Sequence, residues 1–184
     1  TSSSPRKRPT IGLNSIAPNR PYASHLRAFL WWGTTLAWAV TMFYLSSGTF
    51  GGGFTAWLLH QILSLFDVRV SPDTFATLHF LLRKLAHLTE YAIFGLLSYG
   101  CFNGGKRLEW HPRKALCSLA IAAGFSVADE YHQRFAPGRG ASLWDCAIDT
   151  LGAVLGVAFL YAHERYSQMK SRRMAARKES PAET

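Results

Sequence analysis

Long runs of apolar residues, separated by short polar segments, dominate the pattern of this chain. Residues 28–46 hold 19 positions without a single charge. As a helix they would measure roughly 28 Å, about the thickness of a bilayer's hydrocarbon core. Trp31 and Trp32 near its start and Tyr44 near its end suit the two membrane interfaces. The core helix of a soluble domain rarely runs this long without a charge, so the pattern predicts a transmembrane helix.

Three further apolar segments follow, and each is long enough to span a bilayer once its polar end is counted. They cover residues 74–102, 115–128 and 143–162. A shorter apolar run, residues 54–66, follows three consecutive glycines and is too short to span. We expect it to form an amphipathic helix at the membrane interface. The predicted fold is therefore all-α, a polytopic membrane protein with a four-transmembrane-helix bundle and a short interfacial helix after the first span.

Composition alone leaves two classes open, because a net charge of +9 suits both a nucleic-acid binder and a membrane protein. The basic residues flank the apolar spans, which argues against nucleic acid as a partner. Fifteen of the 20 Lys and Arg lie in residues 1–27, 103–114 and 164–184, against three in the opposite loops. By the positive-inside rule both termini are then cytoplasmic. We expect a disordered basic cytoplasmic arm (1–27), a transmembrane domain (28–163) and a charged cytoplasmic tail (164–184).

Ionisable residues in the spans gather at one depth, on the side opposite the termini. The second span brings Lys84, His87 and Glu90 to this layer, and the fourth brings Asp145 and Asp149. The end of the third span and the loop after it add the remaining polar residues, namely Asp129, Glu130, His132, Gln133, Arg139 and Ser142. Charged groups facing lipid cost on the order of 3 kcal/mol or more, so we expect these to face the bundle interior.

Helical spacing supports an inward orientation. Lys84, His87 and Tyr91 lie at i, i+3 and i+7 and share one helix face. Asp145 and Asp149 share a face with the Gly-x-x-x-Gly pair 152/156 of the fourth span. Such a pair lets a neighbouring helix approach closely. The polar residues and the close-packing face therefore point together into the bundle.

This polar layer has two interpretations. It is either a pocket open to the outer face, or a set of structural ion pairs that join Lys84 or Arg139 to Glu130 or Asp145. In a pocket, His87 and Glu130 are candidates for general base and acid, and Lys84 and Arg139 for holding a phosphate or carboxylate. No recognised metal-ligand spacing is present, and no cofactor motif is found.

Three motifs carry a resemblance to a known family. They are residues 83–91 (RKLAHLTEY), 129–139 (DEYHQRFAPGR) and 141–153 (ASLWDCAIDTLGA). Their combined pattern, K-x2-H-x3-Y with E-x2-Q-x5-R-x2-S-x2-D, resembles the VanZ-like family of bacterial integral membrane proteins, over roughly residues 28–159. Many members carry Asn where this chain has Asp149. The resemblance implies that a signature site is formed by Lys84, His87, Glu130, Gln133, Arg139 and Asp145. We take Glu90, Tyr91, Ser142 and Asp149 as further candidate binding residues.

The family's founding member is associated with low-level resistance to the glycopeptide antibiotic teicoplanin. The resemblance therefore implies a bacterial inner-membrane protein. Together with the polar layer at the outer face, the link to this antibiotic leads us to expect a protein that acts on or binds an envelope lipid, a cell-wall precursor headgroup or another phosphate-bearing envelope substrate. A non-enzymatic membrane scaffold, whose ion pairs only fix helix packing, is the alternative. A proton-coupled or small-solute carrier is a third, disfavoured because the inner halves of the spans are apolar. The sequence leaves open whether the protein is an enzyme, and also its cofactors and oligomeric state.

Overall fold

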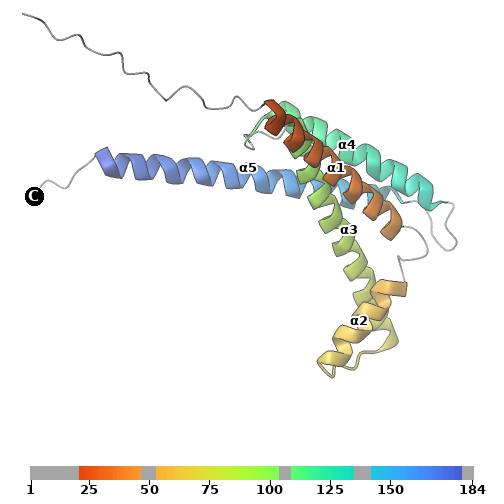
Figure 1. Ribbon diagram of the computed structural model, residues 1–184. Helices are drawn as coiled ribbons and strands as arrows, with labels where there is room; N and C mark the ends of the chain where they lie inside the picture. Colours follow the sequence, from red (N-terminus) through yellow and green to blue (C-terminus); the bar gives the residue numbers. More distant parts are fainter. Residues whose placement is uncertain (1–20, 47–52, 104–108, 135–141, 180–184) are drawn as a thin grey trace, which may run out of the picture.

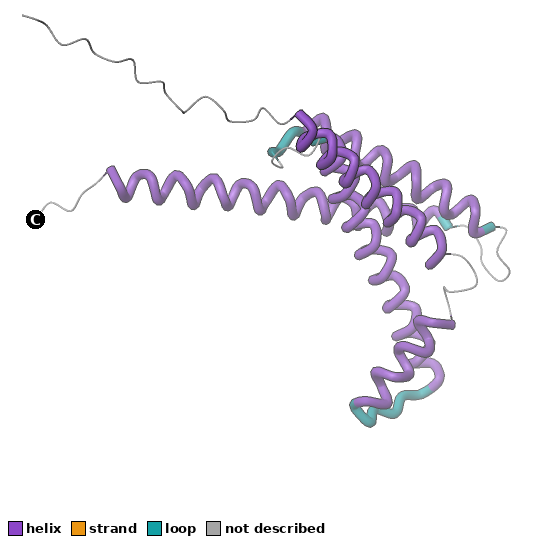
Figure 2. Tube along the Cα trace, in the orientation of Figure 1, coloured by secondary structure: helices purple, strands orange, loops and turns teal. Residues whose placement is uncertain are grey.

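The computed structural model describes residues 21–46, 53–103, 109–134 and 142–179, and these contain helices and short connections without a strand. Figures 1 and 2 show the arrangement. The predicted all-α class is confirmed. The helices are α1 (Pro21–Ser46), α2 (Gly53–Leu65), α3 (Pro72–Phe102), α4 (Pro112–Gln133) and α5 (Leu143–Glu179).

Helix α3 is the central element and packs against each of the other four helices. Its start is well specified, because Ser71 caps the first turn by accepting a hydrogen bond from the backbone N–H of Thr74 at 3.2 Å. Pro72 occupies the first helical position, where its missing N–H costs nothing. Helices α1 and α4 also contact one another, and Figure 1 shows them running side by side.

Two of the helices are long and apolar enough to cross a membrane, through residues His25–Ser46 of α1 and Leu143–Ala176 of α5. Large apolar side chains on the outside of the bundle are exposed, among them Phe29, Leu36 and Phe159. The buried positions, in contrast, include several polar side chains. Such a distribution suits lipid as the surrounding medium. Helices α3 and α4 do not meet the same criterion, so the four-span topology stays a prediction.

Both outer helices extend beyond the predicted spans. Helix α1 begins at Pro21, so residues 21–27 are helical, although we expected them in a disordered arm. The proline suits a helix start, and the backbone hydrogen bonds of the span then propagate from it. Helix α5 continues through the predicted charged tail to Glu179. Residues 164–179 are rich in good helix formers such as Ala, Lys, Arg and Met, which explains the continuation.

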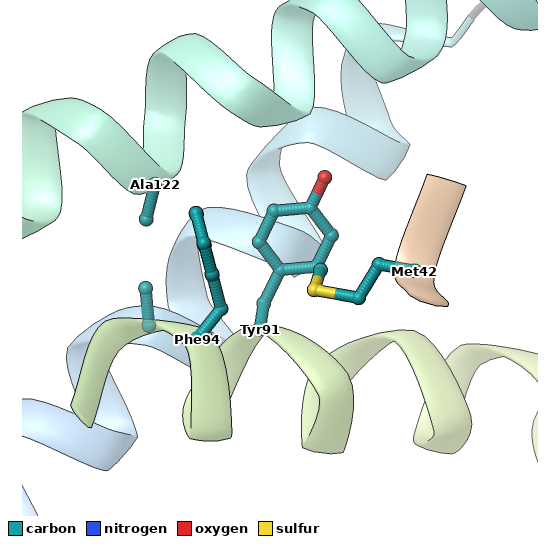
Figure 3. Close-up of a cluster of buried hydrophobic side chains, with 5 residues drawn as sticks. Met42, Tyr91, Phe94 and Ala122 are labelled. Atoms are coloured by element: carbon teal, nitrogen blue, oxygen red, sulfur yellow. The ribbon is translucent and has the colours of Figure 1, made fainter. Parts of the chain in front are cut away.

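The main core joins four helices. It contains Met42 of α1, Tyr91 and Phe94 of α3, Ala122 of α4 and Ala153 of α5. Figure 3 shows the ring of Tyr91 between Met42 and Phe94. Phe94 packs at a tilt on Phe125, with 5.0 Å between ring centroids. This core lies directly beside the layer of polar residues and fixes the helices that carry it.

Helices α3 and α5 approach so closely at two glycines of α5 that no side chain fits at these positions. A Cβ atom added at Gly152 would lie 2.3 Å from the carbonyl oxygen of Leu88, and one at Gly156 would lie 2.1 Å from that of Ala92. Both distances are far below any van der Waals contact. The prediction that the Gly-x-x-x-Gly face packs against a neighbouring helix is thus confirmed, with α3 as that neighbour.

Among the described helices, α3 is the one on which α2 packs. The turn between them begins with Asp67, whose positive φ of 51° places it in the left-handed region that Asp tolerates better than most residues. The backbone N–H of Val68 donates to the carbonyl of Leu63 at 2.9 Å and closes the end of α2. The predicted short helix after the first span therefore exists. Its position at a membrane interface stays a prediction.

Candidate functional site

The polar layer lies where four helices meet. It is formed by the end of α1, the middle of α3, the last turns of α4 and the first turns of α5, which hydrogen bonds and ion pairs link to one another. The chain directions explain this convergence, because α1 and α4 end at the level where α5 begins. The structure thus brings polar residues of α1, α3, α4 and α5 together, while their common depth in a membrane stays a prediction.

The first contact joins α3 to α5. Lys84 forms an ion pair with the carboxylate of Asp145, and its ammonium also lies 5.2 Å from the ring centroid of Phe80. The side chains of Lys84 and Asp145 keep 23% and 31% of their surface exposed. Asp145 is in the first turn of α5, where a carboxylate interacts favourably with the helix dipole. The Lys84–Asp145 pair is one of the ion pairs that we expect if the polar layer serves to hold the helices together.

The second contact lies one turn deeper. Asp149 is almost fully buried, and its Oδ2 accepts a hydrogen bond from the hydroxyl of Ser126 at 2.8 Å. Its other oxygen, Oδ1, lies 3.5 Å from Nδ1 of His87 and has no hydrogen-bond partner. The imidazole of His87 thus has a carboxylate on one side. An acid in this position can orient the ring and stabilise its protonated form.

The third contact joins α1 to α4. The Oδ2 atom of Asp129 accepts hydrogen bonds from the hydroxyl of Ser46 at 2.8 Å and from Nε2 of Gln133 at 3.0 Å. Nε2 of Gln133 also donates to Oγ of Ser46 at 2.7 Å. All three side chains are buried. The network therefore supplies Asp129 with donors where water is excluded, and it ties the last residue of α1 to α4.

Glu130 fixes the start of α5. Its Oε2 atom accepts a hydrogen bond from the backbone N–H of Ser142 at 2.8 Å, and the residue is only 5% exposed. The carbonyl of Ser142 in turn accepts hydrogen bonds from the N–H groups of Asp145 and Cys146. Glu130 thus satisfies one of the free donors that precede a helix. His87 pairs with Asp149, so the structure does not join the candidate base and acid, His87 and Glu130, to each other.

A cavity of about 210 Å³ opens beside these contacts. It lies between the end of α1, helix α2 and the face of α3 that carries His87. Its lining is mainly apolar and polar at a few positions, and it comprises Leu45, Ser46, Phe54, Thr55, Leu58, Leu82, Arg83, Ala86, His87 and Glu90. His87 and Ser46 belong both to the cavity lining and to the carboxylate network. Through these two residues the buried acids connect to a space that a ligand can enter.

The remaining candidates take different positions. Glu90 lines the cavity, while its backbone carbonyl accepts a hydrogen bond from the indole of Trp38 at 3.1 Å. Tyr91 is 1% exposed and belongs to the core, where its hydroxyl has no hydrogen-bond partner. Arg139 lies outside the described residues. Lys84 is held by Asp145, so of the two bases that we expected to hold an anion, the structure describes only one, and that one is already paired.

Several site residues escaped the sequence analysis. Ser126 was not selected, although it shares a helix face with Asp129, Glu130 and Gln133 at spacings of three, four and seven residues. Ser46 gave no signal, because a serine at the end of an apolar span is unremarkable. Arg83 was not selected as a candidate, although it lies inside a predicted span, and it lines the cavity. An ionisable residue inside a span is by itself a reason to look for a functional role.

The described residues contain no group of three or more His, Cys, Asp or Glu side chains placed to hold a metal ion. The described side chains offer ionic binding and hydrogen bonding, and His87 can carry a proton.

Comparison with known proteins gives one match. The VanZ/LLP1 family model matches residues 31–163, which is most of the chain and includes every element of the site. No curated protein and no solved structure matches the chain. The match covers well over half of the sequence and includes the motifs that carry the polar layer. The chain therefore belongs to the VanZ/LLP1 family.

Proposed function

We propose that this protein binds the headgroup of an envelope lipid or of a lipid-linked cell-wall precursor at the polar end of its helix bundle. The single observation that carries the proposal is the cavity beside His87. It combines an apolar lining with an entrance to a network of buried acids, and this is the combination that an amphiphile requires. Its volume of about 210 Å³ is below the usual ~300–1,000 Å³ of small-molecule pockets. It suits a headgroup with the start of one chain.

The proposal includes the topology that the sequence predicts. With four spans and both termini in the cytoplasm of a bacterium, the polar end of the bundle faces the outer leaflet. Lipid-linked cell-wall precursors are presented at that leaflet. An effect on glycopeptide susceptibility, as implied by the resemblance to the teicoplanin-resistance protein, would follow from binding or altering such a precursor.

A substitution that fills the cavity tests this function. We expect Ala86→Leu to reduce the lipid that copurifies with the protein in mild detergent by about tenfold, because the larger side chain occupies the cavity. Ala37→Leu makes the same change on the exposed face of α1 and serves as the control. Mass spectrometry of extracted lipids gives the measurement. Equal lipid on Ala86→Leu and wild type, with both proteins folded, would contradict the proposal.

A non-enzymatic scaffold is the second candidate, and a specific observation favours it. Lys84 is paired with Asp145, and Asp129 is supplied with donors by Ser46 and Gln133, so much of the polar layer is satisfied from within the protein. Under this alternative the substitutions in the layer lower thermal stability, and none of them changes lipid content. The Ala86→Leu experiment separates the two functions because it leaves all of these contacts in place.

A further inference from the structure

Two charged side chains of opposite sign line the cavity, and neither is paired with another described residue. Arg83 and Glu90 both lie on α3 and are partly buried. Among the described residues neither side chain forms an ion pair or a hydrogen bond. The two described acids at the start of α5 are engaged with other side chains, Asp145 with Lys84 and Asp149 beside His87. An unpaired charge in a mainly apolar cavity is costly, and a ligand that brings the opposite charge would remove this cost.

Their spacing suits one ligand with two charges. Arg83 and Glu90 are seven residues apart, which places them on the same helix face with roughly 10 Å between their backbone positions. His87 lies between them and lines the same cavity. Both side chains are long enough to reach inward from either end of this interval. A ligand between them would meet a cation at one end and a carboxylate at the other.

The rest of the lining defines the non-polar part of that ligand. Leu45 of α1, Phe54 and Leu58 of α2, and Leu82 and Ala86 of α3 are the apolar lining residues. They come from three helices, so an apolar group placed there is enclosed on several sides. Burial of such a group contributes about 0.8 kcal/mol per methylene. A soluble zwitterion would leave this surface without a partner, whereas an acyl chain covers it.

We propose that the occupant of this cavity is an aminophospholipid, a lipid with a phosphate and a primary ammonium group in its headgroup. Arg83 binds the phosphate, which matches the planar fork of its guanidinium. Glu90 accepts hydrogen bonds from the ammonium, and the apolar lining holds the first part of one acyl chain. The inference rests on the proposed function and names the class of lipid that the same site takes.

Comparison of headgroups shows why this class fits best. A phosphatidylglycerol satisfies Arg83 but leaves the carboxylate of Glu90 unpaired, and the two negative charges then share one cavity. A phosphatidylcholine has both charges, yet its ammonium carries three methyl groups and cannot donate a hydrogen bond. The phosphatidylethanolamine headgroup supplies both the charge and the N–H donors. A site with buried polar groups discriminates strongly against ligands that leave them unpaired.

The test uses the full chain, delipidated in detergent and titrated with phosphatidylethanolamine, phosphatidylcholine or phosphatidylglycerol of identical acyl chains, with native mass spectrometry as the readout. We expect phosphatidylethanolamine to bind about tenfold tighter than the other two. Glu90→Gln should remove this preference, while Arg83→Gln should weaken phosphatidylethanolamine binding by about tenfold. Glu109→Gln and Arg113→Gln make the same changes at exposed positions outside the cavity. They should change neither the affinity for phosphatidylethanolamine nor the preference for it over the other two lipids.

The outcomes separate the two proposals. Binding of all three lipids with equal affinity would overturn the aminophospholipid inference and leave the proposed function standing. Binding of none of them would overturn the aminophospholipid inference and leave the lipid-linked precursor as the ligand of the proposed function, whereas binding that Ala86→Leu leaves unaltered would overturn both. Displacement of the bound lipid by soluble phosphoethanolamine at equal concentration would contradict the role of the apolar lining. Should a variant fail to fold, the comparison of the three lipids on the wild-type protein still decides.

Discussion

The two sides of α3 are built in opposite ways. Toward α5, glycines bring the two backbones into contact, and Lys84 is neutralised by Asp145. Toward α2 and the end of α1, the helices leave a cavity of about 210 Å³, and Arg83 and Glu90 face it without partners in the part of the chain that the structure describes. The same helix thus carries paired charges on its tightly packed side and unpaired charges on its open side.

This difference indicates which part of the polar layer serves stability and which serves binding. Paired, well-packed groups have already made the interactions available to them, so little is left for a ligand. Unpaired groups beside a cavity retain that capacity. The polar layer therefore does not act as one unit. The structural and the ligand-binding interpretations of the layer apply to its two sides separately, and four substitution experiments can break or sharpen the contrast.

The largest effect is expected where the backbones touch. Gly156→Leu places a side chain where even a Cβ atom would lie 2.1 Å from the carbonyl of Ala92, so α5 must move away from α3. We expect a loss of about 3 kcal/mol or more in the free energy of unfolding, or failure to fold. Thermal denaturation in detergent measures it. Gly124→Ala is the control, because a Cβ there meets nothing within 4 Å, and it should stabilise α4 by about 0.5–1 kcal/mol.

The ion pair should give the next largest effect. Lys84→Asp leaves two carboxylates facing one another, and Asp145→Lys leaves two cations. We expect each to cost about 2 kcal/mol of unfolding free energy, less than for a fully buried pair because both side chains are partly exposed. The double variant Lys84→Asp/Asp145→Lys, in which the two charges are exchanged, should recover about half of the lost free energy of unfolding. If it melts no higher than the weaker single variant, the pair does not stabilise the contact between α3 and α5.

A smaller loss is expected from Ser126→Ala. The substitution removes the hydroxyl that donates to the buried carboxylate of Asp149 at 2.8 Å, which leaves that oxygen unsatisfied. We expect about 1 kcal/mol of destabilisation, and the melting temperature again gives the measurement. Ser171→Ala removes an exposed hydroxyl that bonds only to its own helix, so it is the matched control. Equal melting temperatures for the two variants would show that Asp149 does not depend on Ser126.

The smallest change in stability should occur on the open side. Arg83→Gln and Glu90→Gln each remove a charge that has no partner within the described protein, so we expect free energies of unfolding within about 0.5 kcal/mol of wild type. Circular dichroism of delipidated protein checks this. A loss comparable to that of the ion-pair variants would mean that Arg83 or Glu90 is structural, and the contrast between the two sides of α3 would fail.

Much of the helical arrangement could be predicted from sequence because it depends on local pattern. The uninterrupted apolar run of residues 28–46 lies within α1, and the short run after the triple glycine corresponds to α2. The spacing of Gly152 and Gly156 identified the face of α5 that packs closely. Depth along a span also follows from counting residues, which is why Lys84 and Asp145 were placed in one layer before their pairing was known.

Partner choice within the layer could not be predicted, because it depends on how the helices rotate and cross. Lys84 could pair with Glu130 or Asp145 on spacing alone, and the structure shows Asp145. The cavity could not be predicted from the sequence either. Its lining comes from three helices, and the periodicity of the sequence does not determine how these helices lie relative to one another. The contribution of the end of α1 to the polar network was the hardest to predict from the sequence. Ser46 joins the network only because α1 stops at the level where α4 also ends.

The continuity of α5 has a mechanical consequence. Its 37 residues form one helix of about 55 Å, well beyond the ~30 Å of a hydrocarbon core. Asp145 and Asp149 lie in its first two turns, and Tyr166, Met169 and Met174 are exposed near its far end. A continuous helix resists twisting, so a rotation at the aspartates would reappear as the same rotation of that distant surface. A spectroscopic probe attached at the far end of α5 would therefore report a rotation that begins at the polar layer.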